Sequence, residues 1–588
     1  MSKRLLPLVA ASFLFLGGCA TPPPVAEDNT RGSYRHTENY LNWLIDREMA
    51  ENDITGISIA LVDDQQVIWQ QGFGHADLEQ GIPATPETIY RAGSIAKVFT
   101  AAATMQLAER GRLDIDRPLT EALPEFSIKT RFPKAGPVTP RNVMTHHSGL
   151  PSNFLRGMFV RDPGRFETVI EGLRDQYLSF PPDYVFSYSN VGMALLGASV
   201  QQISGEPFDR YMEHNFFQPL GMTSSSFAAR AVAKAYDQHK EIEVFSLRDM
   251  PAANLLSNVV DLSQFLKMQF ADGRAGNRQL LSPASVREMV RVQNAGFPLT
   301  FEQYVGLGWM LSGIEVPGGG VVASHGGSLP DSHSMMAMLP EHKLGVVVLS
   351  NSTTSHASVS KIATEALRLM LAAKTGIRPQ AKAIVRAPER EPSPEELRLF
   401  NGHFDTLVGL AKVSTASGKI DVEAVGHHFR LVPHEDGLLS LKYKLLGLLP
   451  VRVGAFDDIR LSLVRIGGRQ IIVGRIGNES LMFGEKLQQT DIPENFLQRI
   501  GHYEIIDKID GPAPNHIVLK EDDGLLVGEV RFPERPELLL RIGFQPVSES
   551  EAVTAGLGSG RGDTLRLYNE NNEERLGFSG YQLRKKLN

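Results

Sequence analysis

Between residues 34 and 375 the apolar positions follow strand-like and helix-like spacings in turn, with glycine and proline at the joints. Residues 57–69, interrupted by an Asp-Asp turn, predict a β-hairpin. Two further strands are expected within 335–349, and 358–373 has apolar residues at helical spacing. Strands near both ends of this region, with helices between them, predict an α/β (α+β) domain.

The pattern changes after a segment rich in proline and charge at 376–394, which we interpret as an interdomain linker. Short alternating strands then dominate. Residues 459–473 predict a hairpin across a Gly-Gly turn, and 516–530 predict another across Asp-Asp-Gly. The C-terminal third is therefore expected to be all-β.

A weak internal repeat runs through this β region. Gly402-His403-Phe404 is echoed by Gly501-His502-Tyr503, and 479–483 by 574–578, at nearly equal separations. Two small antiparallel barrels explain the echo most economically, and one continuous β sandwich is the alternative. The two domains expected from the repeat span 395–490 and 491–588.

The N-terminus has the features of a targeting segment. Two basic residues precede an apolar run at 5–16 that is too short to span a bilayer, and Leu-Gly-Gly-Cys follows, ending at Cys19. This tetrapeptide resembles the bacterial lipoprotein box, and Cys19 is the only cysteine of the chain. The resemblance implies a signal peptide at 1–18, lipidation of Cys19 and a tether at 19–33. A plain secretory signal with a chance cysteine is the alternative.

The residue after Cys19 is Ala20 rather than aspartate, which suits sorting to the outer membrane, facing the periplasm. The predicted location is therefore the cell envelope, with a lipid anchor as the contact with the membrane.

Composition excludes one class of partner. The 588 residues carry 60 Lys and Arg against 67 Asp and Glu, a formal charge of -7, with no basic stripe to follow a phosphate backbone. Nucleic acid is therefore not an expected partner. The length favours three or four domains. The histidines show no metal-ligand spacing, and nothing implies a cofactor.

Ser94 and Lys97 form the first candidate for chemistry. They are three residues apart at the start of an almost wholly apolar helical run, so they share a helix face. An isolated ammonium in so apolar a setting costs several kcal/mol or loses its proton. Loss of the proton is what a general base requires, because a lysine near its reference pKa of about 10.4 is protonated at neutral pH.

Each short motif alone is weak evidence, because the chain holds rivals. Ser358-Val-Ser-Lys361 is a second Ser-x-x-Lys, and Tyr40-Leu-Asn42 matches the pattern of Tyr188-Ser-Asn190. His325-Gly326-Gly327 likewise has a rival in His147-Ser-Gly149. A helix N-cap followed by a surface lysine explains any single Ser-x-x-Lys equally well.

Order and context together are more specific. Ser94 begins a buried helix, Tyr188-Ser-Asn190 precedes an apolar helix at 191–203, and His325-Gly326-Gly327 immediately precedes the strands at 335–349. Only the set that starts at Ser94 has all three motifs in this order. The ordered triple resembles the signature of serine β-lactamases and penicillin-binding proteins, in which the third motif is commonly Lys-Thr-Gly.

Surrounding motifs resemble the branch of that family that contains class C β-lactamases, esterases and D-aminopeptidases. The resemblance covers roughly residues 40–375, and implies a catalytic cleft between an α/β subdomain with an antiparallel sheet and a helical subdomain. The hydrolase domain is therefore expected at 34–375. The supporting segments are 90–93, 145–151, 204–208, 219–222 and 306–309.

The resemblance also implies roles. Ser94 would attack an acyl carbonyl, with Lys97 and Tyr188 sharing the proton; which of the two is the base stays open. The backbone N–H groups of Ser94 and Ser328 would form the oxyanion hole. The residues expected to bind substrate are Asn190, His325, Gly326 and Gly327.

The expected function is hydrolysis of a small ester, amide or D-amino-acid peptide, as in D-aminopeptidases or esterases. β-Lactamase or D,D-carboxypeptidase activity is the alternative within the enzyme class, and a catalytically silent, surface-anchored binding protein is the alternative outside it. A glycine-rich loop at 556–562 is expected to reach the active-site mouth, as in the D-aminopeptidases that the chain resembles, with a floppy surface loop as the alternative. The sequence leaves the oligomeric state open.

Overall fold

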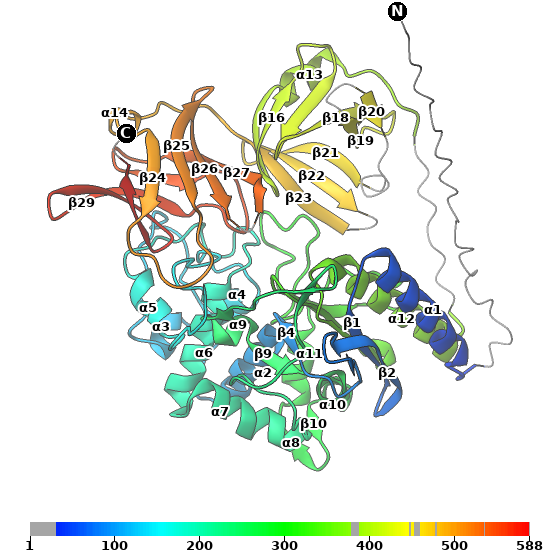
Figure 1. The fold of residues 1–588 in the computed structure, drawn as a ribbon. Helices are drawn as coiled ribbons and strands as arrows, with labels where there is room; N and C mark the ends of the chain where they lie inside the picture. The colour runs from blue at the N-terminus through cyan, green and yellow to red at the C-terminus, as the bar shows by residue number, and fades with distance from the viewer. Residues whose placement is uncertain are drawn as a thin grey trace, which may run out of the picture.

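The computed structural model describes residues 31–377, 387–445, 449–451, 459–476, 479–533 and 535–586. These ranges form an N-terminal domain (residues 31–377), a first barrel (402–486) and a second barrel (501–585). Figure 1 shows both barrels on the same side of the N-terminal domain, the first in yellow-green to yellow and the second in orange to red. The predicted signal peptide, Cys19, and most of the tether and linker lie outside the described residues.

The sheet of the N-terminal domain is antiparallel and joins strands from both ends of the domain. Its central strand β1 pairs with the whole of β14, from Ile57 opposite Ser350 to Asp63 opposite Leu344, and with β2 on its other side. The predicted hairpins are confirmed. In sheet order the strands are β12 (Ala323–Ser328), β13 (His333–Leu339), β14 (Leu344–Ser350), β1 (Gly56–Asp63), β2 (Gln66–Asp77) and β3 (Ile82–Pro83).

Helices cover both faces of this sheet. Ile57, Ile59 and Leu61 pack against α1 (Arg35–Glu51) and α12 (His356–Thr375) in one buried cluster. The intervening Ala60 and Val62 belong to a second cluster, which contains α2 (Ala96–Glu109) and α10 (Val259–Phe270). Because both faces are covered, β1 is buried almost throughout, and this explains its nearly continuous apolar sequence.

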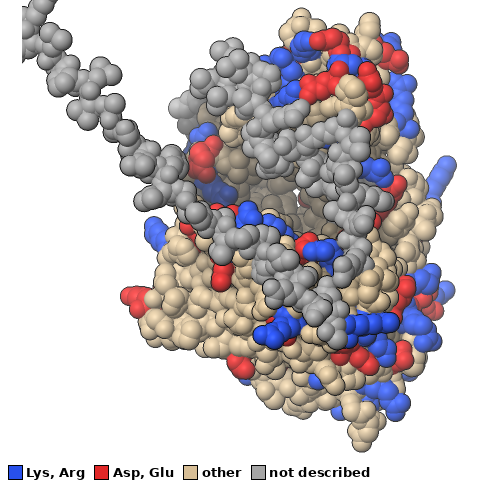
Figure 2. Space-filling model, turned by 90° about the vertical axis from the view of Figure 1, so that its right-hand side faces the viewer, with Lys and Arg blue, Asp and Glu red and all other residues tan. Residues whose placement is uncertain are grey.

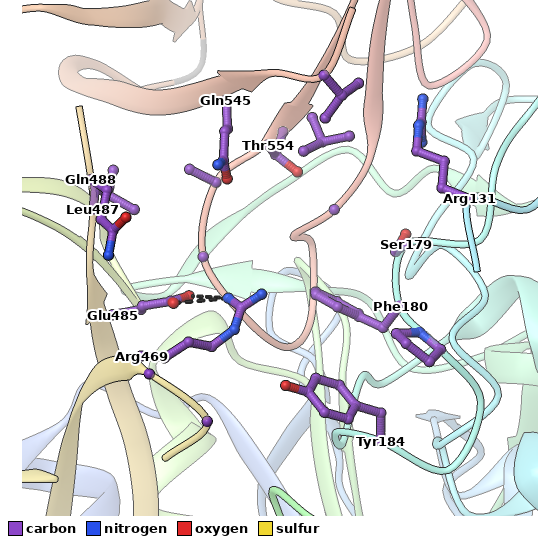
Figure 3. Close-up of a pocket in the computed structure, with 18 of the residues that line it drawn as sticks. Arg131, Ser179, Phe180, Tyr184, Arg469, Glu485, Leu487, Gln488, Gln545 and Thr554 are labelled. Carbon is purple, nitrogen blue, oxygen red and sulfur yellow. Dashed lines mark hydrogen bonds and ion pairs between the residues drawn. The ribbon is translucent and has the colours of Figure 1, made fainter. Parts of the chain in front are cut away.

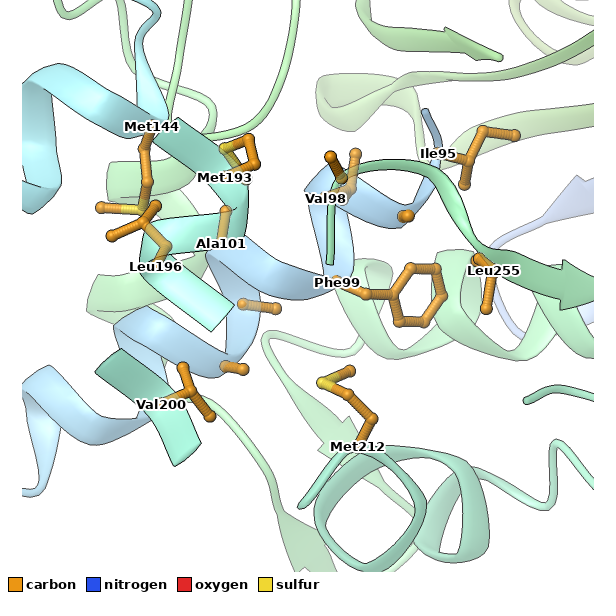
Figure 4. Packing of buried hydrophobic residues seen from close by; sticks show 14 of the residues in the cluster. Ile95, Val98, Phe99, Ala101, Met144, Met193, Leu196, Val200, Met212 and Leu255 are labelled. Carbon is orange, nitrogen blue, oxygen red and sulfur yellow. The ribbon is translucent and has the colours of Figure 1, made fainter. Parts of the chain in front are cut away.

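Helix α2 is the centre of the helical subdomain. Every residue from Ala96 to Leu107 is buried, and Figure 4 shows Val98, Phe99 and Ala101 in contact with side chains from several neighbouring elements. The ring of Phe99 lies 4.2 Å from that of Phe265 on α10, centroid to centroid. A helix packed on all sides cannot rotate or shift without opening cavities, so it holds its first turn rigidly.

The C-terminal third consists of two closed eight-stranded barrels, and the expectation of two small barrels is confirmed. The first closes through the β15–β23 and β18–β19 pairs, with β20 (Leu449–Val451) as an addition on β19. Its strands are β15 (Gly402–Thr406), β16 (Gly409–Ser414), β17 (Ile420–Ala424), β18 (His427–Pro433), β19 (Leu439–Leu445), β21 (Ile459–Ile466), β22 (Arg469–Ile476) and β23 (Glu479–Lys486).

The second barrel closes through the pairing of its first and last strands, and a short helix precedes each barrel: α13 (Pro394–Phe400) and α14 (Glu494–Leu497). Its strands are β24 (Gly501–Ile505), β25 (His516–Asp522), β26 (Leu525–Phe532), β27 (Arg535–Pro546), β28 (Glu551–Thr554), β29 (Thr564–Glu570), β30 (Glu573–Phe578) and β31 (Tyr581–Lys585).

The sequence repeat coincides with this architecture only in part. Gly402 and Gly501 both begin the first strand of their barrels. The second echo was misaligned, because it pairs β23, the last strand of the first barrel, with β30, the next-to-last strand of the second. The structural counterparts are Lys486 and Lys585, each of which ends a last strand and donates to a backbone carbonyl three residues before that glycine.

Lys and Arg side chains are interspersed with Asp and Glu on the face shown in Figure 2, which is hollowed near its centre. Among the described residues, no helix combines the length and apolar character needed to cross a membrane.

Candidate active site

Ser94 lies between a short strand and the buried helix. β4 (Tyr90–Gly93) ends at Gly93, whose φ of +56° is left-handed, and α2 begins two residues after Ser94. A Cβ on Gly93 would lie 3.2 Å from Cα of Gly327 and 3.3 Å from the backbone N of Ser328. Glycine therefore permits strand β12 to approach, and the N–H of Ser328 lies beside the residue that precedes Ser94. The two predicted oxyanion donors are brought together at this turn.

Lys97 follows on the first turn of α2 and is fully buried. Its Nζ lies 3.2 Å from Ser94 Oγ, 2.7 Å from Asn190 Oδ1 and 2.9 Å from the backbone oxygen of Ala252. Burial holds the pKa of Lys97 well below its usual value, and the negative charge of Asp249 acts in the opposite direction. The neutral amine is therefore favoured far more than in a surface lysine.

Three oxygens lie within hydrogen-bond distance of Lys97 Nζ. Those of Asn190 and Ala252 only accept hydrogen bonds, so each takes one N–H of the Lys97 side chain and orients Nζ toward Ser94. Asn190 is held in this orientation because its Nδ2 donates to Asn153 Oδ1 at 2.8 Å. Nζ also donates to Ser94 Oγ at 3.2 Å, and because a hydroxyl can both accept and donate, a deprotonated Lys97 can take the Ser94 proton across the same contact.

The ring of Tyr188 faces the Nζ of Lys97. Its ring centroid is 4.5 Å from Lys97 Nζ and 4.2 Å from the centroid of His146. Burial raises the pKa of Tyr188 above its usual value, while a hydrogen bond with Ser94 lowers it. The phenol therefore keeps its proton at neutral pH. His146 also fixes the chain here, since its Nδ1 accepts the N–H of Ser189 at 3.1 Å.

Asn190 begins α6 (Asn190–Ser204), which Ser189 caps through a hydrogen bond from the N–H of Gly192. His325, Gly326 and Gly327 lie on β12, which pairs with β13 as a third strand of the hairpin. The motif immediately precedes strands β13 and β14, as expected, and it also lies on a sheet strand of its own, which was not predicted. Two adjacent glycines carry no apolar alternation, so the pattern did not reveal the strand.

His325 completes the group, with its ring centroid 6.3 Å from that of Tyr188. Burial, and secondarily the charge of Lys97, lowers the pKa of His325 to about 3. Its Nδ1 is 2.8 Å from the carbonyl oxygen of Gly326. Because a carbonyl only accepts, Nδ1 carries the proton, and in the neutral ring Nε2 is an acceptor.

The comparison with known families agrees with this geometry. The model of the family described as Beta-lactamase matches residues 41–370, more than half of the chain. The chain belongs to the beta-lactamase family. The matched range contains Ser94, Lys97, Tyr188, Asn190 and His325, and the family expected from the ordered motifs is confirmed.

Two proteins of similar sequence and one solved structure of similar fold illustrate the relationship. Protein flp of Staphylococcus aureus (strain MRSA252) is 24% identical over 335 residues, which are 54% of this chain and 64% of that protein. The match thus spans less than two thirds of the length of flp. Penicillin-binding protein 4 of Amycolatopsis lactamdurans is 27% identical over 376 residues, 60% of this chain and 94% of that protein. The crystal structure of SurE with D-Leu has a TM-score of 0.55 at 23% identity, and covers 76% of this chain and 98% of that one.

The rival Ser-x-x-Lys motif of this beta-lactamase-family chain has a different environment. Ser358 Oγ donates to Glu48 Oε2 at 2.8 Å, and Lys361 pairs with the other oxygen of the same carboxylate at 2.5 Å. Ser358 is buried between α1 and α12, on the other side of the sheet from α2. The hydroxyl is engaged as a donor to a carboxylate, so the motif holds two helices together.

Two contributors to the beta-lactamase-family site were missed in the sequence. Asn153, which orients Asn190, lies two residues after the 145–151 motif, and that proximity was a usable signal. Ala252 contributes only a backbone oxygen, for which side-chain patterns give no signal. No cluster of His, Cys, Asp or Glu suited to a metal ion occurs within the described ranges.

Proposed function

We propose that the protein is a serine hydrolase that forms an acyl-enzyme on a small ester, amide or D-amino-acid peptide. The observation that carries the proposal is the contact set of buried Lys97, in which the oxygens of Asn190 and Ala252 hold Nζ at 3.2 Å from Ser94 Oγ. The test is the time course of p-nitrophenol release from p-nitrophenyl acetate. An acyl-enzyme predicts an initial burst of p-nitrophenol equal in amount to the enzyme.

In this mechanism Ser94 Oγ attacks the carbonyl carbon while its proton passes to Lys97 Nζ. The carbonyl oxygen becomes an oxyanion, stabilised by the backbone N–H groups of Ser94 and Ser328 at typically about 3 kcal/mol per donor. The leaving group departs with a proton delivered through Lys97 and Tyr188. Water then attacks the acyl-enzyme, returns its proton along the same groups and releases the acid.

Tyr188 acts as a proton donor and relay rather than as the resting base. Its pKa is raised, so the phenolate is scarce at neutral pH, whereas the lowered pKa of Lys97 makes its free amine more abundant than that of an exposed lysine. Of the two candidates left open by the sequence, we assign the base to Lys97.

The substrate class follows from His325. With a pKa of about 3 the ring is neutral at physiological pH, because a histidine is charged only below its pKa. In the Lys-Thr-Gly pattern the lysine supplies a permanent positive charge that suits a substrate carboxylate. The site of this chain therefore lacks that charge. The accepting Nε2 favours substrates that present a donor, such as the amine of a D-amino acid.

The wild type is accordingly expected to hydrolyse p-nitrophenyl acetate or D-amino-acid amides far better than penicillins, and His325→Lys to narrow the difference. A charge-assisted hydrogen bond of roughly 1.5 to 3 kcal/mol corresponds to a change in selectivity of about ten to over a hundredfold. The measurement is the ratio of kcat/KM values for the two substrate classes. Efficient penicillin turnover by the wild type, unchanged in His325→Lys, would contradict this specificity and leave the Ser94 mechanism standing.

We also propose that the protein is anchored to the cell envelope by lipid on Cys19, in the outer membrane facing the periplasm. The support is the Leu-Gly-Gly-Cys sequence followed by Ala20. Cys19→Ser should move the protein to the soluble fraction with its esterase activity intact, as measured by fractionation and p-nitrophenyl acetate hydrolysis. Retention of Cys19→Ser in the membrane fraction would point to an anchor elsewhere.

A further inference from the structure

The second barrel lies directly on the part of the N-terminal domain that leads into the active site. Figure 1 shows its orange and red strands above the cyan loops of that domain. Two serines of the barrel contact those loops. They are Ser559, in the loop at 556–562, and Ser579, in the turn between β30 and β31.

Ser559 contacts the catalytic tyrosine through the backbone. Its Oγ accepts the N–H of Tyr188 at 2.8 Å, and the next residue, Gly560, donates its N–H to Ser152 Oγ at 2.7 Å. The loop thus contacts the segment that carries Tyr188, in agreement with its expected place at the active-site mouth.

The loop is also tied to the first barrel. Arg561 Nε donates to the buried carboxylate of Asp405 at 2.6 Å, and its Nη2 donates to the carbonyl oxygen of Thr406 at 2.7 Å. Behind the loop lies a cavity of about 940 Å³, lined by Gly556 and Gly562. Figure 3 shows this cavity between the second barrel, the first barrel and the N-terminal domain. Leu557 of the same loop is buried against Phe180 and Ile471, so the loop is held by apolar packing as well as by these polar contacts.

Ser579 holds the segment 152–156 from the barrel side. Its Oγ accepts the N–H of Leu155 at 3.0 Å and donates to the carbonyl oxygen of Asn153 at 3.3 Å, and its own carbonyl accepts the N–H of Arg156 at 3.2 Å. A Cβ on the adjacent Gly580 would lie 2.3 Å from the ring of Phe154. The barrel turn therefore fits closely against this segment.

The same segment supports Asn190 on its other side. The N–H of Asn190 donates to the carbonyl oxygen of Ser152 at 2.8 Å, and its Nδ2 donates to Asn153 Oδ1 at 2.8 Å. Asn190 in turn holds Lys97. One serine of the barrel thus reaches Tyr188 by one hydrogen bond, and the other reaches Lys97 through Asn153 and Asn190.

We propose that the second barrel is part of the catalytic apparatus, and that Ser559 and Ser579 are positioning residues for Tyr188 and for Lys97. This inference rests on the proposed Ser94 hydrolase. Because it concerns the positions of Tyr188 and Lys97, it applies also to substrates too small to touch the barrel.

The pH profile separates positioning from a merely structural role. The Tyr188 ring helps to exclude water from Lys97, and burial is what lowers the Lys97 pKa. If Tyr188 loses its support, water reaches Lys97 and its pKa rises. Since the base acts only when deprotonated, the acidic limb of the kcat/KM profile should then move to higher pH.

The test uses p-nitrophenyl acetate and the full chain carrying Ser559→Ala, Ser579→Ala or both. Each single variant should lower kcat by about tenfold, the equivalent of about 1.4 kcal/mol, and should move the acidic limb upward. Ser559→Thr, which keeps the hydroxyl, should restore both. Ser548→Ala is the matched control, since that hydroxyl accepts N–H groups only within its own turn of the second barrel.

Wild-type kcat and an unmoved acidic limb in the double variant would overturn the positioning role, as would a lower melting temperature with the limb unmoved. Ser94→Ala, measured in parallel, distinguishes failure of the proposed hydrolase mechanism from failure of the positioning role. If Ser94→Ala retains full turnover, the proposed hydrolase mechanism fails; if it is inactive while the serine variants match the wild type, only the positioning role fails.

Discussion

Ser94→Ala is expected to lose at least about a thousandfold in the hydrolysis of p-nitrophenyl acetate, because it removes the hydroxyl that contacts Lys97. Ser358→Ala should keep wild-type turnover, although it removes the serine of the same short motif. Ser358 donates a hydrogen bond to the Glu48 carboxylate. This contact lies on the opposite face of the sheet from Lys97. The measurement is kcat/KM for both variants at neutral pH.

Ser358→Ala also removes a buried hydrogen bond to a charged group, so its thermal unfolding should be checked first. The comparison is valid at a temperature where the variant is fully folded. Loss of turnover in folded Ser358→Ala, with Ser94→Ala active, would show that the active site had been assigned to the wrong motif.

Replacing Lys97 should be nearly as damaging as replacing Ser94. Lys97→Met removes the base and is expected to lower kcat/KM by about 10² to 10⁴, the usual contribution of a positioned general base. Lys97→Arg should be equally impaired despite its similar length, since a guanidinium does not lose its proton in proteins. Lys361→Met is the matched control, because Lys361 pairs with Glu48 outside the site.

The wild-type pH profile adds a second readout for Lys97. A lysine with its usual pKa would confine activity to strongly alkaline solution, whereas the lowered pKa of Lys97 should keep kcat/KM high at neutral pH and let it fall only on acidification. Activity that rises steadily up to pH 10, or Lys97→Arg with wild-type turnover, would refute Lys97 as the base.

Local patterns were sufficient for much of this fold. The hairpin of β1 and β2, the strands β13 and β14 and helix α12 all stand out in the sequence, because burial on a sheet or helix face produces a regular period. The order of three short motifs selected the Ser94 set over Ser358. In the structure that set is joined at one place, whereas Ser358 is engaged with Glu48.

The features that the sequence did not predict depend on contacts that leave no periodic pattern of apolar residues along the chain. Strand β12 carries the Gly326-Gly327 pair in place of an alternating pattern. Ala252 acts through its backbone, and Ser559 meets Tyr188 across 371 positions of the chain. The docking of a barrel on a loop is set by the surfaces of both, which the spacing of residues along one chain does not encode. The glycines at 556–562 marked the loop, and the structure supplies its contacts.

The most direct test of the central claim is mass spectrometry of the protein after reaction with a fluorophosphonate. The account predicts one adduct per chain, located on the peptide that contains Ser94, and none in Ser94→Ala. An adduct on Ser358, or no adduct on a folded protein as expected of a silent binding protein, would contradict it.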